Sequence, residues 1–147
     1  MDVKSYLQEI RNERLEIRQL QDRIDELRMS LLPSAIRYDK PNVQKSPDDQ
    51  LAKIEGEINE IEMQLRDKLE ALVERYNVAQ WCIGMIQSST HRQVLYEYYL
   101  NADRPSWDQV ARKMDYTSDR VYQLHREALK KLEEIFEKEG YTCQNQN

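Results

Sequence analysis

Glycine, proline and cysteine are scarce in this sequence, with 3, 4 and 2 residues among 147. Together with a charged fraction of 33%, this scarcity predicts a mainly helical chain with one compact domain and an elongated extension. Cys82 lies on an apolar helical stripe and Cys143 in a polar tail, so we expect two unpaired thiols and no disulfide framework.

Long apolar runs are also missing from the sequence. None approaches the length of a membrane-spanning helix, and the first residues, MDVKSYLQEIRNER, contain no signal-peptide core. We therefore expect a cytoplasmic protein that has no membrane partner.

Motifs that would support catalysis are absent as well. The sequence has no CxxC, no HExxH and no glycine-rich phosphate loop, and neither His91 nor His125 has a second ligand at a metal-like spacing. The acidic residues between 55 and 62 could suggest a magnesium-binding helical pyrophosphohydrolase, but matching acids on a second helix do not appear. They fit the solvated flank of a coiled coil better. We expect no enzyme activity, no cofactor and no metal.

Two segments have the heptad spacing of coiled-coil helices. In the first, at about residues 2–32, apolar side chains recur every seven positions, and Glu13 interrupts the seam. In the second, at about residues 47–87, Lys68 and Arg75 occupy seam positions, where their charged ends should extend toward water.

The simplest arrangement of these helices is a long antiparallel hairpin formed by residues 1–87, with residues 33–46 as the linker and Ser46 as a helix cap. A hairpin alone buries little apolar surface, so it should serve as a spacer, dimerise or meet a partner protein. The second helix has an outer apolar stripe that could make this contact: Leu69, Tyr76 and Ile83.

The segment from 106 to 132 has the apolar spacing of a helix-turn-helix followed by a long second helix. Ser106 and Gln109 form a capping-box pattern, and Thr117 is a good cap for the second helix. Asp115 stands in the turn, where a left-handed backbone usually favours glycine. The residues expected inside this motif are Val110, Ala111, Met114, Tyr116, Val121 and Leu124.

A DNA-binding domain is therefore predicted over residues 88–139. A short helix over 91–100 would complete its core, Gly140 would end its last helix, and residues 140–147 would form a flexible tail. The class predicted for the whole chain is all-α, a helical hairpin followed by a helix-turn-helix domain.

Hydrogen-bonding side chains gather opposite the buried stripe of the second helix, which spans about residues 117–130. Glutamine and arginine can pair bidentately with adenine and guanine, and aspartate can accept from cytosine, so these side chains could read base edges in a major groove. The predicted base-reading residues are Ser118, Asp119, Arg120, Tyr122, Gln123 and Arg126. The predicted phosphate contacts are Arg104, Arg112, Lys113, Thr117 and Lys130.

Charge is the main objection to DNA binding, because the chain carries a formal −5 at pH 7. Residues 104–131, however, contain seven Lys or Arg against four Asp or Glu, a local net charge of +3. This modest surplus fits a weak, partner-assisted or dimeric DNA binder. The other interpretation is that the charges form an ordinary solvated surface.

The segments HRQVLYEYYL, SWDQVARKM and YTSDRVYQLHREALKKL resemble region 4 of sigma-70 factors, which reads promoter DNA. The preceding IRYDKPNVQKSPDDQLAKIEGEI looks like the linker and second helix of small phage and prophage proteins of Gram-positive bacteria, a family grouped with RinA-like and ArpU-like late transcription regulators. The resemblance covers nearly the whole chain. By position it implies base reading by Ser118, Asp119, Arg120, Tyr122 and Gln123.

This resemblance implies a regulator, an activator of phage late genes, in the cytoplasm of a bacterial host. Double-stranded promoter DNA would be its main partner, and its hairpin would contact host RNA polymerase or a second protomer. Ser118 stands where the family usually has arginine, so the promoter sequence should differ from the housekeeping one. Two other classes stay open: a small terminase-like subunit that recognises DNA for packaging, and a helical adaptor that binds no DNA.

Overall fold

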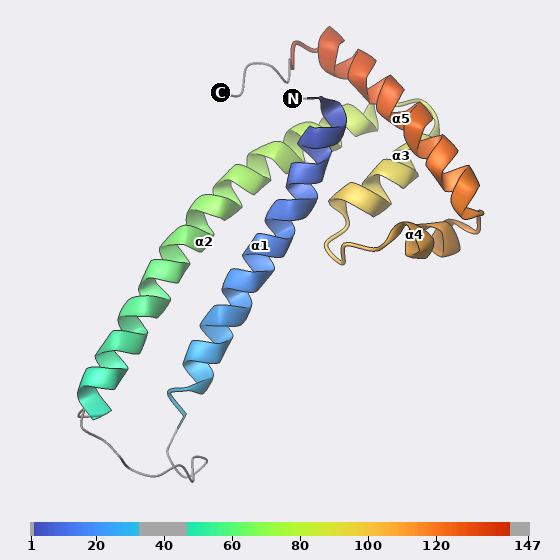
Figure 1. Cartoon of the computed structure of the whole chain (residues 1–147). Helices are drawn as coiled ribbons and strands as arrows, with labels where there is room; N and C mark the ends of the chain where they lie inside the picture. Colours follow the sequence, from blue (N-terminus) through green and yellow to red (C-terminus); the bar gives the residue numbers. More distant parts are fainter. Residues whose placement is uncertain (1, 33–46, 142–147) are drawn as a thin grey trace. The chain divides into compact units, whose positions relative to one another are not determined.

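The computed structural model describes residues 2–32 and 47–141, and every regular element in these ranges is helical (Figure 1). The predicted all-α class is therefore confirmed. None of the described helices is both long and apolar enough to cross a membrane. The elements are α1 (Val3–Met29), α2 (Pro47–Gly84), α3 (Ser89–Leu95), the π-helical turn η2 (Tyr96–Leu100), α4 (Trp107–Met114) and α5 (Ser118–Lys138).

Three predictions concern residues outside the described ranges. They are the linker at 33–46, the helix cap at Ser46 and the thiol of Cys143. The tail predicted at 140–147 is described only through Tyr141.

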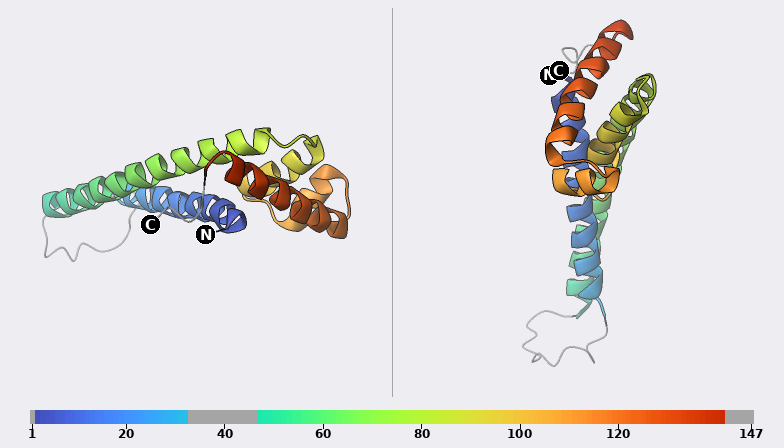
Figure 2. Two further views of the ribbon diagram at one scale, coloured as in Figure 1. Left: turned by 90° about the horizontal axis from the view of Figure 1, so that it is seen from above. Right: turned by 90° about the vertical axis from the view of Figure 1, so that its right-hand side faces the viewer.

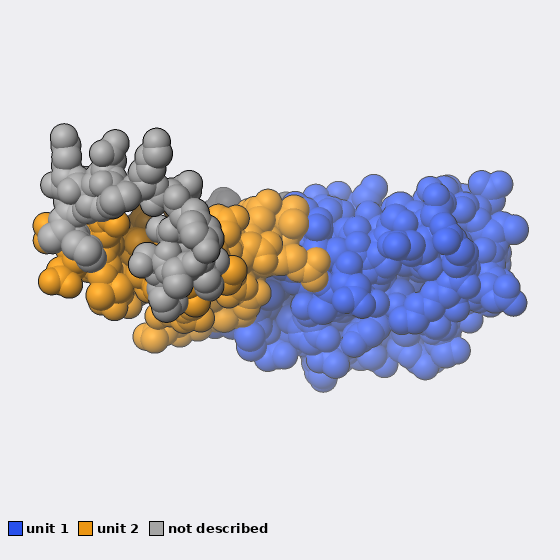
Figure 3. All heavy atoms as spheres, turned by 90° about the horizontal axis from the view of Figure 1, so that it is seen from below, with its two compact units in different colours: residues 1–14, 72–147 blue, residues 15–71 orange. Residues whose placement is uncertain are grey.

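The chain divides into two compact units (Figure 3). Unit 1 contains residues 1–14 and 72–147, and unit 2 contains residues 15–71. This division differs from the one expected after residue 87, because the first turns of α1 and the last turns of α2 belong to the same unit as the three shorter helices.

Unit 2 consists of the middle and end of α1 paired with the first two thirds of α2. The two segments lie side by side in both views of Figure 2, and Ile24, Leu27 and Ile58 are buried between them. Ion pairs flank this seam, such as Arg28 with Glu62 at 3.2 Å. Both side chains of that pair are exposed, so the pair adds little stability and apolar burial dominates.

Charged residues at predicted seam positions are paired across the two helices. In unit 2 the Lys68 ammonium lies 2.7 Å from the Glu16 carboxylate. In unit 1 the Arg75 guanidinium contacts both Glu13 and Glu9, the latter at 3.1 Å. The charge of Glu13 at the seam is thus compensated by a partner charge on α2.

The core of unit 1 is organised around α5. Its buried stripe is Val121, Leu124, His125, Ala128, Leu132 and Phe136. The beginning of α1 contributes Tyr6, whose ring meets Phe136 edge to face at 5.4 Å. The end of α2 contributes Ile83, which is only 4% exposed. The expectation that Ile83 belongs to an outer stripe is wrong, because this end of α2 is covered within unit 1.

The helix caps and the left-handed turn residue around α4 and the start of α5 form as predicted. Ser106 Oγ accepts a hydrogen bond from the Gln109 amide at 3.2 Å, and Gln109 Oε1 accepts from the Ser106 amide at 2.8 Å. Thr117 Oγ1 accepts from the Arg120 amide at 3.2 Å. Asp115 adopts the left-handed conformation, with φ 59° and ψ 43°.

Some details of the elements differ from expectation. Tyr116 is 42% exposed instead of buried, because it lies in the turn and on neither helix. The predicted helix at 91–100 begins at Ser89 and widens into a π-helical turn from Tyr96. Helices α1 and α2 end about three residues early, because their last turns are closed by bonds between residues three apart, such as Leu32 to Met29.

The left-handed turn residue yields a stability prediction. Replacing Asp115 with glycine should keep or raise the free energy of unfolding, because glycine adopts a positive φ without steric cost. Replacing it with valine should lower that free energy by about 1–2 kcal/mol, since a branched side chain is strained there. Urea denaturation of the parent and the two variants measures their free energies of unfolding. Equal stability of the valine and glycine variants would contradict the prediction.

Candidate nucleic-acid interface

The residues predicted to contact DNA lie on α4, on α5 and in the segments before these helices. Nine of the eleven are exposed, and Ser118 and Arg104 are half-buried. Most of those on α5 lie away from the buried stripe, as the helical period of 100° per residue requires, but Ser118 lies in line with Phe136 on the buried side. We call the following set the outer face of α5: Asp119, Tyr122, Gln123, Arg126 and Lys130.

Polar side chains in the first three turns of α5 are linked by hydrogen bonds. Arg120 donates to Gln123 Oε1 at 3.1 Å, and Gln123 Nε2 donates to Glu127 Oε1 at 3.3 Å. Ser118 Oγ donates to Asp108 Oδ1 at 3.2 Å and so connects α5 to α4. The Gln123 amide therefore has a defined polarity, with its oxygen toward Arg120 and its nitrogen toward Glu127.

Three of the predicted cations present their charge to solvent. Arg112, Arg126 and Lys130 are exposed, and within the described part of the chain none of them takes part in an ion pair or a side-chain hydrogen bond. Their charges are available to an anionic partner.

Two other predicted cations are engaged inside unit 1. The Lys113 ammonium lies 2.8 Å from the carboxylate of Glu97, which is buried, and this bond raises the pKa of Lys113 above its usual value. The Arg104 guanidinium donates to the Arg11 carbonyl at 3.1 Å, and Arg11 donates to the Arg104 carbonyl at 3.1 Å. Sequence spacing could not reveal either bond, because both connect residues on separate elements.

The exposed charge of α5 changes sign along the helix. Residues 118–131 contain four Lys or Arg and two Asp or Glu, a net charge of +2. Residues 132–138 contain one lysine and three glutamates, a net charge of −2. An anionic partner is therefore attracted to the first half of the helix and repelled by the second.

An aromatic stack lies between α4, α5 and the beginning of α1. The rings of Trp107 and Tyr98 stack at 3.7 Å, and the Arg11 guanidinium lies 4.1 Å from the centre of the Tyr98 ring. Tyr122 meets Trp107 edge to face at 5.7 Å while remaining 40% exposed. The stack holds α4 and α5 against the first turns of α1, so Trp107 has a structural role.

His125 lies on the inner side of α5. Its Nε2 is 2.6 Å from the Tyr99 hydroxyl, and both side chains are buried. Burial lowers the pKa of His125 to about 4, with further lowering from the positive charges of Lys4 and Arg126. Burial also raises the pKa of Tyr99. At neutral pH the pair is uncharged, so His125 has the packing role that its position on the stripe predicts.

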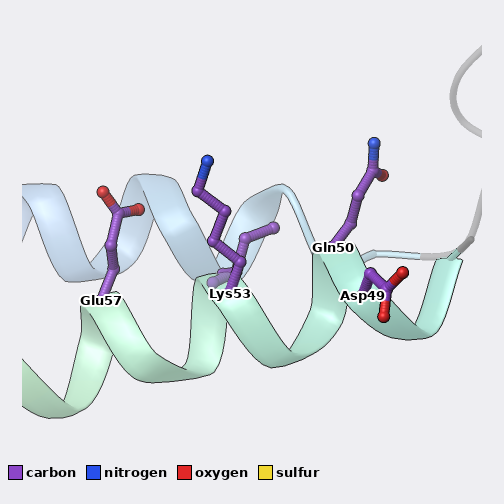
Figure 4. Close-up of a pocket in the computed structure, with 5 residues that line it drawn as sticks. Asp49, Gln50, Lys53 and Glu57 are labelled. Carbon is purple, nitrogen blue, oxygen red and sulfur yellow. The ribbon is translucent and has the colours of Figure 1, made fainter. Parts of the chain in front are cut away.

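A shallow pocket on α2 in unit 2 offers no comparable chemistry. Figure 4 shows Asp49, Gln50, Lys53 and Glu57 extending separately from the helix, with the two carboxylates at opposite ends. Across residues 2–32 and 47–141, no three His, Cys, Asp or Glu side chains gather in a way that could hold a metal ion.

Comparison of the chain with protein-family models, with curated proteins and with solved structures finds no match. Any functional assignment therefore depends on the surface formed by α4 and α5.

The buried histidine yields a pH prediction. The unfolded chain binds a proton at His125 near pH 6.5 and the folded chain only near pH 4, so stability from this residue is present above pH 6.5 and is lost as the pH falls toward 4. Between pH 7.5 and 4.5, the free energy of unfolding should fall by about 2 kcal/mol more in the parent protein than in His125→Gln. Carboxylates titrate in both proteins, so comparing their urea denaturation at the two pH values isolates the contribution of His125. An equal fall in unfolding free energy in the two proteins would contradict the lowered pKa of His125.

Proposed function

We propose that this protein binds double-stranded DNA sequence-specifically, with α4, the turn at Asp115 and α5 acting as a helix-turn-helix. The observation that carries the proposal is the outer face of α5, where exposed hydrogen-bonding side chains stand opposite a fully buried stripe. A helix of this kind fits the major groove, and Gln123 and Arg126 have the chemistry to pair with adenine and guanine.

Phosphate contacts would come from the cations that have no partner within the protein. Arg112 on α4 and Lys130 on α5 are exposed and unpaired in the described part of the chain. Thr117, Lys113 and Arg104 have internal bonds, which make them weaker candidates. The acidic last turns of α5 limit the DNA contact to the first half of that helix.

The biological role that we propose is regulation of phage transcription, with activation of late genes by recruitment of host RNA polymerase. A net charge of only +3 around the motif supports a protein that needs help to bind tightly. Unit 2 exposes Met63 and Leu69 on α2, and such apolar side chains could meet polymerase or a second protomer. A small terminase-like subunit would instead prefer a packaging site, and a pure adaptor would show no salt-dependent DNA binding.

The base-reading residues can be tested together. The double variant Gln123→Ala and Arg126→Ala should lose specific binding to its promoter, by about a hundredfold in affinity, while its thermal melting stays close to that of the parent. Gel-shift titration with the duplex selected by the parent protein measures the loss. The matched control, Gln64→Ala with Arg66→Ala, changes the same residue types at exposed positions in unit 2 and should bind normally. Unchanged affinity in the first variant would reject the assignment.

The phosphate contacts can be tested on two neighbouring cations of α4. Arg112→Ala should weaken binding to all duplexes and reduce the slope of log K against log salt by about 1. Lys113→Ala should change that slope little but should lower the melting temperature, since it leaves the buried Glu97 carboxylate without its ammonium partner. Equal effects of the two variants on the slope would show that Lys113 contacts phosphate as well.

A further inference from the structure

Glu127 and His91 extend the hydrogen-bonded chain on α5 into the interior of unit 1. His91 lies on α3, where it is buried, and its Nε2 is 2.9 Å from Glu127 Oε2. The other carboxylate oxygen of Glu127 accepts from Gln123 Nε2 at 3.3 Å. One glutamate thus connects a buried imidazole to the Gln123 amide on the outer face.

We infer that Glu127 and His91 are positioning residues that orient Gln123 and Arg120 for base recognition. This inference rests on the proposed function. A carboxylate can only accept, so His91 must donate from Nε2, and Gln123 must present its nitrogen to Glu127. Gln123 Oε1 then faces Arg120, which donates to it at 3.1 Å.

The orientation of the Gln123 amide decides which base it can read. Bidentate pairing with adenine needs the amide oxygen to accept from N6 and the amide nitrogen to donate to N7. Each of these atoms has a second bonding site beyond the one used within the chain, so the internal bonds leave adenine recognition open. A glutamine with a preset amide loses less conformational freedom on binding than one that rotates.

The negative charge of Glu127 should repel DNA phosphates, so its place on a helix proposed to read DNA needs an explanation. The hydrogen bond from His91 lowers the pKa of Glu127, so its carboxylate is charged at neutral pH. Arg120 and His91 are the other charged or titratable groups in the same bonded chain. If Glu127 only repelled DNA, its removal would strengthen binding to every duplex equally. If it positions Gln123, its removal lowers the preference for one sequence.

The experiment begins by selecting a preferred duplex from a random pool with the parent protein. Affinities for that duplex and a scrambled duplex then give a specificity ratio. Glu127→Ala should bind the scrambled duplex slightly more tightly, yet its specificity ratio should fall roughly tenfold. Glu127→Gln keeps an acceptor oxygen and should retain the ratio within about threefold. The matched control Glu134→Ala removes an exposed carboxylate from the same helix and should leave the ratio unchanged.

His91 variants separate positioning from charge, because they leave Glu127 in place. His91→Ala should lower the specificity ratio, and His91→Gln should restore it, since its amide can donate from a similar position. If His91→Ala unfolds before binding can be measured, the specificity ratios of the Glu127 variants alone test the positioning role. A ratio that stays unchanged in Glu127→Ala would overturn the inference while leaving the proposed function intact.

A measurement without DNA tests the same contact directly. The side-chain amide signals of Gln123, assigned by their loss in Gln123→Ala, should shift in Glu127→Ala and in His91→Ala but stay in place in Glu134→Ala. Unshifted signals would overturn the inference. Selection of no sequence by the parent protein would overturn the proposed function, and the positioning role with it.

Discussion

Burial of one stripe of α5 is the constraint on which the rest of unit 1 depends. Val121, Leu124, Ala128, Leu132 and Phe136 are all almost fully removed from solvent. Each large apolar side chain so buried contributes roughly 1.5–3 kcal/mol, far more than any surface ion pair in the protein. Because the helix can rotate only at the cost of this burial, the opposite side chains are held outward at a fixed angle. The candidate interface is therefore a consequence of packing.

Several charged side chains of the protein compensate other charges within it. Arg75 forms ion pairs with two carboxylates of α1, and Lys113 forms one with a buried glutamate. Arg104 is half-buried and bonded to the backbone of α1. The positive charge left for a partner is accordingly smaller than the number of basic residues suggests. This supports a DNA contact that relies on Arg112, Arg126 and Lys130 for attraction and on the side chains of α5 for selectivity.

Local signals in the sequence predicted much of the fold. The capping box at Ser106, the cap at Thr117, the left-handed Asp115 and the buried stripe of α5 all depend on residues within one or two turns of each other, and all are present. Contacts between distant residues could not be predicted. The burial of Ile83, the bond between Arg11 and Arg104, and the bond between His91 and Glu127 require knowledge of which helices meet. Spacing alone could have indicated the pair Gln123 and Glu127, four residues apart on one helix.

The most direct test of DNA binding through α5 is a nuclear magnetic resonance titration of the labelled protein with the duplex it selects. We expect salt-dependent shifts of backbone and side-chain amides concentrated at Arg112, at Thr117 to Arg126 and at Lys130, with the signals of unit 2 unchanged. Shifts confined to α1 and α2, or an absence of shifts at low salt, would contradict the proposed function.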